Sequence, residues 1–234
     1  GYVYSLLRQY EASQPEQQVW KAVDQLAAQA ADGTFLSSYD LPQAQPGPYE
    51  EGRDLQQEYL ALFEDREAIT LKQGESSLLG DAREYLVERG GVVLARVGLR
   101  AQGEPVTRLA VFTTQDWAVD YIRPELQAHD YTLTLPAAFS VSLNGTPLTA
   151  QPDEKGECTY AVFGLYLPPE FSITDQAGTQ ARYTIRNGKV LAEYFNYSLT
   201  LPSSLTVQVN GQSWPGQKQG TDRVRYDIAL LEQP

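Results

Sequence analysis

The chain has 234 residues, of which 42% are hydrophobic and 21% are charged, and its formal net charge is −12. This composition is typical of a soluble globular protein with one large core or two ordinary ones, and it excludes wholesale disorder. Neither half of the chain has a basic stripe. Nucleic acid and anionic lipid surfaces are therefore poor partners, because neutralising phosphate needs clustered Lys and Arg. No apolar run approaches the length that crosses a bilayer.

The N-terminal part predicts two helices joined by a loop. Residues 13–32 form an amphipathic pattern, and Ser13 and Glu16 have the spacing of a capping box. Residues 41–52 are rich in Pro and Gly, which favour a loop over regular structure. Apolar side chains on one side of 53–66 predict the second helix.

After Asp65 the hydrophobic period changes from helical to strand-like. We expect a tight turn at Gly90-Gly91 and another turn at 102–104. The expected strands are 68–73, 83–89, 92–100, 106–114 and 116–122. Two helices followed by an antiparallel sheet predict an α+β domain over 1–123, with the sheet wrapped around the N-terminal helix.

The C-terminal part contains an internal repeat. The stretch "YTLTLPAAFSVSLNG" (131–145) returns as "YSLTLPSSLTVQVNG" (197–211), and the alignment extends without a gap over 131–165 and 197–231. A weaker copy, "LPPEFSITDQAG", lies at 167–178. Each full copy predicts a strand ended by Pro, a second strand, and an Asn-Gly type I′ turn. Residues 124–234 therefore predict an all-β domain, either a β-sandwich or two small stacked β units.

Three features together resemble a known family: the helix start "YEASQPE" (10–16), the closing strand with Trp117, and the Leu-Pro…Asn-Gly units. The pattern is similar to extracytoplasmic Gram-positive proteins like the teicoplanin-resistance-associated membrane protein family. That resemblance implies an NTF2-like or cystatin-like domain followed by small β domains, placed outside the cell behind one N-terminal membrane helix. It supplies no catalytic residues.

The chain begins with Gly1 and contains no Met, so we expect it to be the trimmed part of a longer polypeptide. Any contact with a membrane would then be made only through a tether upstream of residue 1. The expected location is the cell surface.

Residues able to perform catalysis are scarce. The sequence has no nucleophile elbow, P-loop, zinc-protease or dinucleotide motif. His129 is the only histidine and Cys158 the only cysteine, which excludes a His-rich or Cys-based metal centre. We expect Cys158 to be a small buried hydrophobe and His129 to lie in a solvated linker. We therefore expect no metal, no cofactor and no enzymatic activity.

Acidic residues cluster near the second helix, at Glu58, Glu64, Asp65 and Glu67. They would support acid–base catalysis only if burial separated their pKa values, and we expect a solvated face instead. The acidic stretch 152–157 is expected to be a solvated turn rather than a calcium loop.

Aromatic side chains are the better candidates for binding. Tyr39, Tyr49 and Tyr59 surround the Pro-rich loop, and tyrosines can stack on a sugar, peptide or small amphiphile while their hydroxyls form hydrogen bonds. We expect Trp20 and Trp117 to fill the core between helix and sheet.

Three functions remain open. The first is a non-enzymatic envelope protein that binds a cell-wall component, a small ligand or a surface protein. The second is a structural spacer or assembly protein, which an unpaired edge strand such as 221–231 would favour. The third is a small NTF2-like enzyme that uses a buried carboxylate.

Overall fold

The structure, a computed structural model, describes residues 2–232. Helices precede a series of largely antiparallel sheets, so the chain belongs to the α+β class. It divides into two compact units: the first runs to Ala128 and also includes Tyr166–Pro168, and the second comprises His129–Leu165 and the residues from Pro169 onward. The sequence-based boundary at 123/124 differs from this division, since the last strand of the first unit continues to Pro124.

Helices occupy the first half of unit 1. They are α1 (Tyr2–Ala12), α2 (Pro15–Asp32), α3 (Phe35–Ser38), α4 (Leu55–Ala61) and a 3₁₀ turn at Arg66–Ala68. The expected capping box does not form: the N-cap of α2 is Gln14, which makes no side-chain cap, and the Ser13 hydroxyl donates to the Tyr10 carbonyl oxygen at 2.8 Å. Helix α1 was not predicted. The second predicted helix, 53–66, is observed as α4, which is shorter and ends at Ala61.

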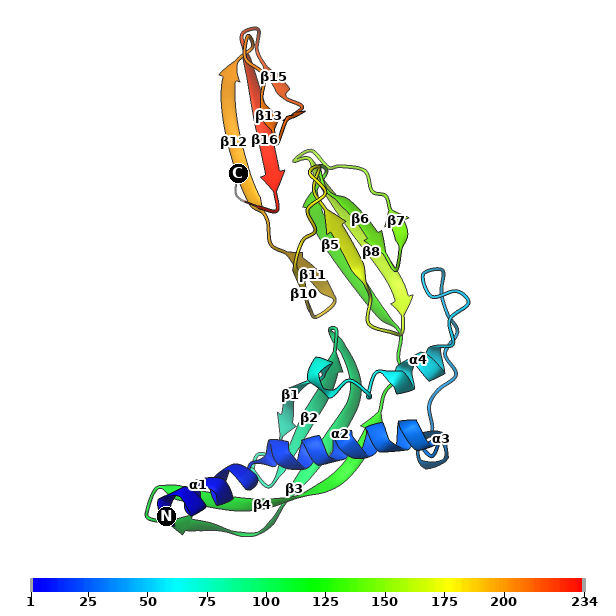
Figure 1. Cartoon of the computed structure of the whole chain (residues 1–234), viewed down its shortest axis with the longest axis vertical. Helices are drawn as coiled ribbons and strands as arrows, with labels where there is room; N and C mark the ends of the chain where they lie inside the picture. Colours follow the sequence, from blue (N-terminus) through cyan, green and yellow to red (C-terminus); the bar gives the residue numbers. More distant parts are fainter. Residues whose placement is uncertain (1, 233–234) are drawn as a thin grey trace. The chain divides into compact units, whose positions relative to one another are not determined.

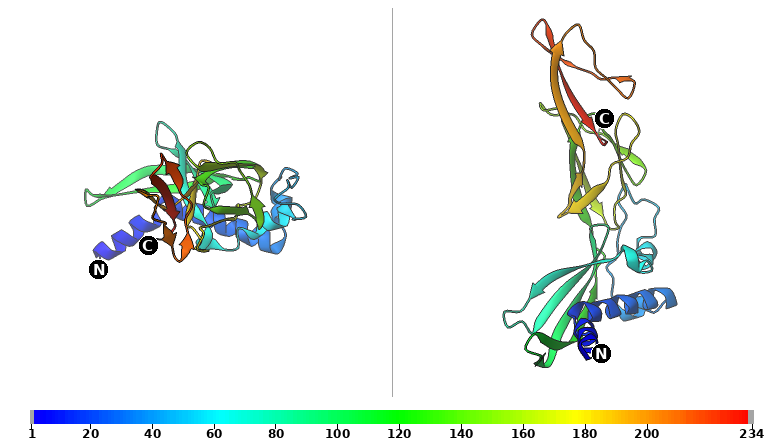
Figure 2. Two further views of the ribbon diagram at one scale, coloured as in Figure 1. Left: turned by 90° about the horizontal axis from the view of Figure 1, so that it is seen from above. Right: turned by 60° about the vertical axis from the view of Figure 1, so that its left-hand side comes forward.

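One antiparallel sheet completes unit 1, in the order β1-β2-β3-β4. Its strands are β1 (Thr70–Ser76), β2 (Ala82–Arg89), β3 (Val92–Arg108) and β4 (Phe112–Pro124). Helix α2 packs against β3 and β4, and both strands bend along their length (Figures 1 and 2). The core between helix and sheet is filled by apolar side chains, including Val23, Leu26, Leu94 and Leu99.

The predicted division of residues 92–122 into three strands is wrong. The register of β3 against β4 shifts between Gln102 and Val106, so the expected turn at 102–104 is a bulge within a continuous pair. The chain reverses instead at Leu109 and Ala110, which adopt positive φ angles of 52° and 57°. A bulge accommodates Gly and Pro without ending the ladder.

The first repeat of unit 2, taken together with the strands that follow it up to Ala192, forms two sheets, in the orders β10-β11-β5-β8 and β7-β6-β9. The strands are β5 (His129–Pro136), β6 (Ser140–Leu143), β7 (Thr146–Leu148), β8 (Glu157–Leu165), β9 (Phe171–Thr174), β10 (Tyr183–Arg186) and β11 (Lys189–Ala192). The pairs are antiparallel apart from β11 with β5, which is parallel. In the weaker sequence copy, strand β9 pairs with β6, and the chain turns back after it to form an antiparallel bridge between Thr174 and Gln180.

The second repeat gives two smaller sheets, β12-β16-β15 and β13-β14. The strands are β12 (Phe195–Pro202), β13 (Gln208–Val209), β14 (Gln212–Ser213), β15 (Gln217–Gln219) and β16 (Arg223–Leu230). In Figure 1, β12 and β16 lie side by side. The core of the second repeat is formed by Trp214, Tyr226, Ile228 and Leu230.

The two repeats share one pattern of pairing. Leu133 lies opposite Tyr160 in the first repeat, and the aligned Leu199 lies opposite Tyr226 in the second. The predicted Asn-Gly turns of the two full copies are confirmed, since Asn144 and Asn210 have φ angles of 49° and 50° and are each followed by a glycine with positive φ. Asn187, with a φ of 50°, and Gly188 form a further turn of this kind. Sequence repetition therefore reproduces strand register as well as strand order.

Candidate functional site

A long loop between α3 and α4, residues 39–54, is the part of unit 1 best suited to binding. It contains turns but no helix or strand. Long loops without regular structure are uncommon in compact domains and usually have a function. Such a loop can form a preformed site only if contacts with the rest of the unit hold it in one conformation.

The Glu50 carboxylate fixes this loop from inside. Glu50 is only 1% exposed. Its two carboxylate oxygens accept hydrogen bonds from the backbone N–H groups of Tyr166, at 2.9 Å, and Leu167, at 3.0 Å. Both donors belong to unit 1. A buried carboxylate is costly unless hydrogen bonds replace its water, and here both oxygens are satisfied. The loop is therefore tied to a distant segment of the chain.

The end of the loop is ordered by the start of α4. The Asp54 side chain accepts a hydrogen bond from the Gln57 backbone N–H at 3.1 Å, which caps the helix. Arg53 donates two hydrogen bonds to Glu58, at 2.8 and 3.0 Å. This bidentate pair holds the guanidinium in one orientation at the edge of the loop.

Between the loop and the start of α4 lies a groove with a volume of about 290 Å³. Apolar side chains and the amides of three glutamines line it, beside Arg53 and Asp54. The lining residues are Leu41, Pro42, Gln43, Ala44, Gln45, Pro46, Arg53, Asp54, Leu55, Gln56 and Leu126. Each glutamine amide can both donate and accept hydrogen bonds, so the groove suits a polar ligand with a small apolar part.

The three tyrosines predicted to bind ligand have different environments. Tyr39 is half-buried and packs on Phe35, with ring centroids 5.1 Å apart, and burial raises the pKa of its phenol. Tyr49 is also half-buried. Both flank the groove along the chain, but neither is among the residues that line it.

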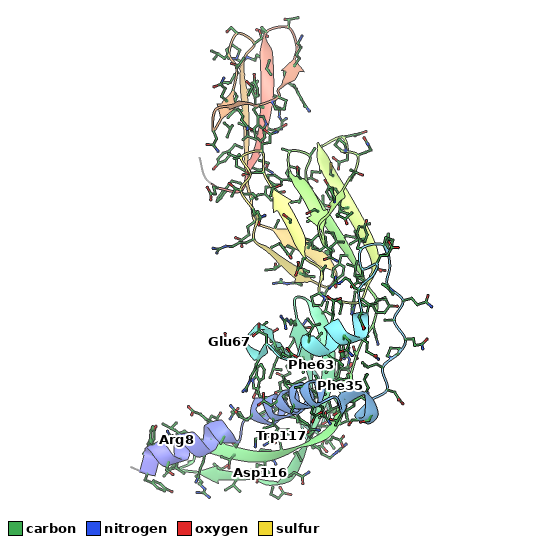
Figure 3. The ribbon with its side chains drawn as sticks, turned by 45° about the vertical axis from the view of Figure 1, so that its right-hand side comes forward. Arg8, Phe35, Phe63, Glu67, Asp116 and Trp117 are labelled. Atoms are coloured by element: carbon green, nitrogen blue, oxygen red, sulfur yellow. The ribbon has the colours of Figure 1, made fainter. Side chains whose placement is uncertain are left out.

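Tyr59 is a core residue, which corrects its assignment as a ligand contact. It is 1% exposed, and its hydroxyl donates to the Leu94 carbonyl oxygen at 2.5 Å. Its ring packs edge-on against Phe35 and Phe63, two side chains that lie close together in Figure 3. Burial raises the pKa of the Tyr59 phenol, so the hydroxyl stays protonated and keeps its hydrogen bond.

Trp20 and Trp117 are half-buried rather than fully enclosed. An arginine guanidinium covers one face of each ring: Arg66 lies 4.7 Å from the centroid of Trp20 and Arg83 lies 4.8 Å from that of Trp117. Such cation–π contacts stabilise partly exposed aromatic rings. Both tryptophans therefore lie partly at the surface, whereas the sequence predicted that they fill the core.

The acidic residues are arranged as the sequence suggested. Glu64, Asp65 and Glu67 are exposed, and Glu67 points away from the ribbon in Figure 3. Glu58 is held by Arg53. In the acidic stretch 152–157, the Asp153 side chain accepts N–H bonds from its own turn, as expected for a solvated turn.

Cys158 is buried, and its thiol lies 3.6 Å from the Ala150 carbonyl oxygen, as expected for a small core residue. His129 opens strand β5 and is half-buried, so it is not a linker residue. The described residues bring no three His, Cys, Asp or Glu side chains together in a way that could hold a metal ion.

A polar network on the sheet of unit 1 escaped the sequence analysis. Arg96 forms ion pairs with Glu84 at 3.0 Å and with Glu125 at 2.5 Å, and the Tyr121 hydroxyl donates to Glu84. Partial burial opposes ionisation of Glu84, but the hydrogen bonds from Tyr121 and Arg96 outweigh it, so the pKa of Glu84 is lowered.

Gly98 makes that network feasible. A Cβ atom at this position would lie 2.1 Å from the Tyr121 ring, so only glycine lets the ring cover the strand. The partners come from three strands and the segment after them, which is why no local motif reveals the network.

Unit 2 contains a larger open cavity of about 610 Å³, lined by loops of its first repeat and by strands β12 and β16 of its second. Its lining mixes charged, amide and aromatic side chains. The side chains with polar or aromatic groups are Lys155, Glu157, Gln176, Asn196, Tyr197, Ser198, Trp214, Gln217, Arg225 and Asp227. Arg225 and Asp227 already form an ion pair with each other, at 3.2 Å.

Comparison of the chain with protein-family models, with curated proteins and with solved structures finds no significant match. Among residues 2–232, no helix combines the length and apolar character that crossing a membrane would require. Function must therefore be argued from the geometry of the chain.

Proposed function

We propose that this chain is a non-enzymatic binding protein of the cell envelope, located outside the cytoplasm. In this proposal, unit 1 is an NTF2-like or cystatin-like domain that carries the ligand groove, and the repeats of unit 2 are sandwich-like modules that present it. A tether upstream of residue 1 would supply any attachment to a membrane. The likeness to teicoplanin-resistance-associated proteins, stated above from the sequence, supports this placement.

The observation that carries the proposal is the loop fixed by Glu50 around an open groove. Both oxygens of the buried carboxylate are satisfied, so the groove wall exists before any ligand arrives. Preformed sites lose less conformational entropy on binding. The amides of Gln43, Gln45 and Gln56, together with Arg53, fit a short peptide or sugar from the cell wall better than a purely apolar molecule.

A structural or assembly role is the second candidate, and one observation favours it. Strand β12 pairs with β16 on one side, and among the described residues no strand pairs with its other side. The example chosen from the sequence, 221–231, is an edge only in part: β16 pairs with β12 along its length and with β15 over Arg223–Arg225.

The enzymatic alternative would need a buried carboxylate that is accessible to substrate. Glu50 is the buried acid of unit 1, but backbone N–H groups occupy both of its oxygens. The carboxyls of unit 1 with a shifted pKa, Asp32, Asp81 and Glu84, all have lowered values, whereas a general acid needs a raised one. These facts support a structural use of the acids.

The test is thermal unfolding of the full chain with cell-wall peptides, sugars and hydrophobic metabolites. A ligand at a hundredfold excess over its Kd adds about 2.7 kcal/mol to the unfolding free energy. We expect one class of wall peptide or sugar to raise the Tm, and Gln43→Ala with Gln56→Ala to abolish the shift. Gln17→Ala, an exposed change on α2, is the matched control. No shift with any compound would overturn the groove as a binding site.

A further inference from the structure

The second repeat is a partial copy of the first. The pairs formed by the flanking strands coincide from Tyr131 to Pro136: Pro136 lies opposite Glu157, and the aligned Pro202 lies opposite Arg223. The inner hairpins coincide too, because Leu143 lies opposite Thr146 and the aligned Val209 lies opposite Gln212. The first repeat therefore shows how the second would look if it were completed.

In the first repeat, β9 covers the outer edge of β6. Phe171 lies opposite Leu143 and Ile173 lies opposite Val141, in an antiparallel pair. The pair is closed by Asn144, whose backbone N–H donates to the Glu170 carbonyl oxygen at 2.9 Å. The Asn144 side-chain oxygen accepts the Glu170 N–H at 3.0 Å.

In the second repeat, the equivalent edge is open. Strand β13 is shorter than β6, since it consists of Gln208–Val209, and among the described residues it pairs only with β14. The aligned asparagine, Asn210, has the same backbone conformation as Asn144, with φ of 50°. No segment within residues 2–232 plays the part that Glu170 plays in the first repeat.

The apolar side chains beside this edge are correspondingly uncovered. Phe139 is 3% exposed in the first repeat, whereas the aligned Leu205 is 51% exposed. Tyr131 is 2% exposed and its counterpart Tyr197 is 36% exposed. Phe171 of β9 packs edge-on against Tyr131, with ring centroids 6.3 Å apart, and Tyr194, which follows β11, packs against Phe139 at 5.4 Å. The same sequence pattern therefore forms a closed core where these side chains are present and an open apolar face in the second repeat.

The open backbone groups can be assigned. The Trp214 backbone N–H donates to the Val207 carbonyl oxygen at 2.8 Å, so Val207 faces β14. Because backbone groups alternate in direction along a strand, the N–H and C=O of Gln208 face the vacant edge. An exposed row of unpaired groups beside apolar side chains is a template for an added strand.

We propose that the second repeat is an acceptor for a β strand from a partner polypeptide. The partner segment has the pattern of β9, Leu-Pro-x-x-Phe-x-Ile, and adds antiparallel to β13 with its Phe opposite Val209 and its Ile opposite Val207. The closely related segments of this chain, at 135–141 and 167–173, are already engaged as β6 and β9. A folded second copy therefore has no such strand to spare. This site is independent of the loop groove in unit 1.

The test uses a fluorescein-labelled peptide of residues 166–176, titrated into the full chain and followed by fluorescence anisotropy. We expect saturable binding, and new protection of the amides of 204–209 from hydrogen exchange. A peptide with Ser in place of the residues equivalent to Phe171 and Ile173 is the ligand control and should not bind.

Acceptor variants decide whether binding uses this edge. Leu205→Ser should weaken binding about tenfold or more, whereas Leu191→Ser, a matched change at a side chain 48% exposed in the first repeat, should not. Gln208→Pro removes the outward N–H and should abolish binding, with near-ultraviolet circular dichroism confirming the fold.

Three results would overturn the proposal. They are the absence of peptide binding by a folded chain, binding that is indifferent to Leu205→Ser and Gln208→Pro, and sedimentation showing that the chain dimerises through this edge. In the last case Leu205→Ser would yield monomers, and the edge would be an interface between two copies.

Discussion

At the scale of single residues, Glu50 shows how one buried charge can hold a functional loop. Glu50→Gln keeps the shape of the side chain but turns one accepting oxygen into a donor, which then faces a backbone N–H. We expect the unfolding free energy of unit 1 to fall by about 2 kcal/mol, because one buried N–H loses its acceptor. Urea unfolding followed by tryptophan fluorescence measures this loss.

The control is Glu51→Gln, an exposed change at the next residue. It should alter the unfolding free energy by less than about 0.5 kcal/mol. Equal effects of the two variants would contradict the role given to Glu50.

Glu84 predicts a pH dependence of stability. Its folded pKa is lowered from the ordinary value of 4.5, so its contribution to stability is fully present above pH 4.5. That contribution is lost as the pH falls through the lower folded value, where the carboxylate is protonated and the ion pair with Arg96 disappears. Glu84→Gln should therefore destabilise the protein at pH 7 by about 1–2 kcal/mol, and the difference from the unmodified chain should shrink towards pH 3.

Urea unfolding at several pH values measures both chains. Glu104→Gln, at an exposed position of β3, serves as the control and should show no such convergence. A Glu84→Gln effect that stays constant down to pH 3 would contradict the ion-pair explanation.

At the scale of elements, the accuracy of sequence reasoning follows how local each signal is. The helix over 13–32, the strand pair joined at Gly90-Gly91 and the Asn-Gly turns were predicted because the residues that determine them are neighbours in the chain. The β3–β4 turn was missed because Leu109 and Ala110 are poor formers of positive φ. Only the pairing of two long strands forces the chain into that conformation.

That strained turn predicts a stabilising substitution. Ala110 has a φ of 57°, a conformation that glycine adopts without a Cβ clash. Ala110→Gly should raise the unfolding free energy by about 0.5–1 kcal/mol. Ala101→Gly, in the body of β3, should lower it by a similar amount, since glycine weakens a strand interior. Thermal unfolding measures both variants, and a loss of stability in both would contradict the assigned turn.

At the scale of the whole molecule, the sequence revealed the repeat and the α+β class, but it could not reveal the partners of distant residues. Tyr59 was assigned to ligand binding although its spacing from Leu55 and Phe63 puts it on the apolar side of the predicted helix, and its hydrogen bond to Leu94 places it in the core. The role of Glu50 could not be predicted, because its donors, Tyr166 and Leu167, are far along the chain. The position of the loop depends on such non-local contacts, and none of the three predicted tyrosines lines the groove.

Unit 1 is built from two separate parts of the chain. The segment Tyr166–Pro168 belongs to it, whereas the residues on either side of this segment belong to unit 2. A fragment of residues 2–128 keeps the Glu50 carboxylate but loses both N–H donors. An uncompensated buried charge is strongly destabilising, so the fragment should be less stable than unit 1 in the full chain, by about 3 kcal/mol.

The effect of Glu50→Gln separates this cause from a general cost of truncation. In the fragment, the neutral amide removes a buried charge that has no partner, so the substitution should leave stability unchanged or raise it. In the full chain the same change is destabilising, and the opposite responses form a double-mutant cycle whose coupling energy isolates the contact. Urea unfolding of the four proteins measures it. A coupling energy near zero would mean that Tyr166 and Leu167 do not stabilise the loop through Glu50.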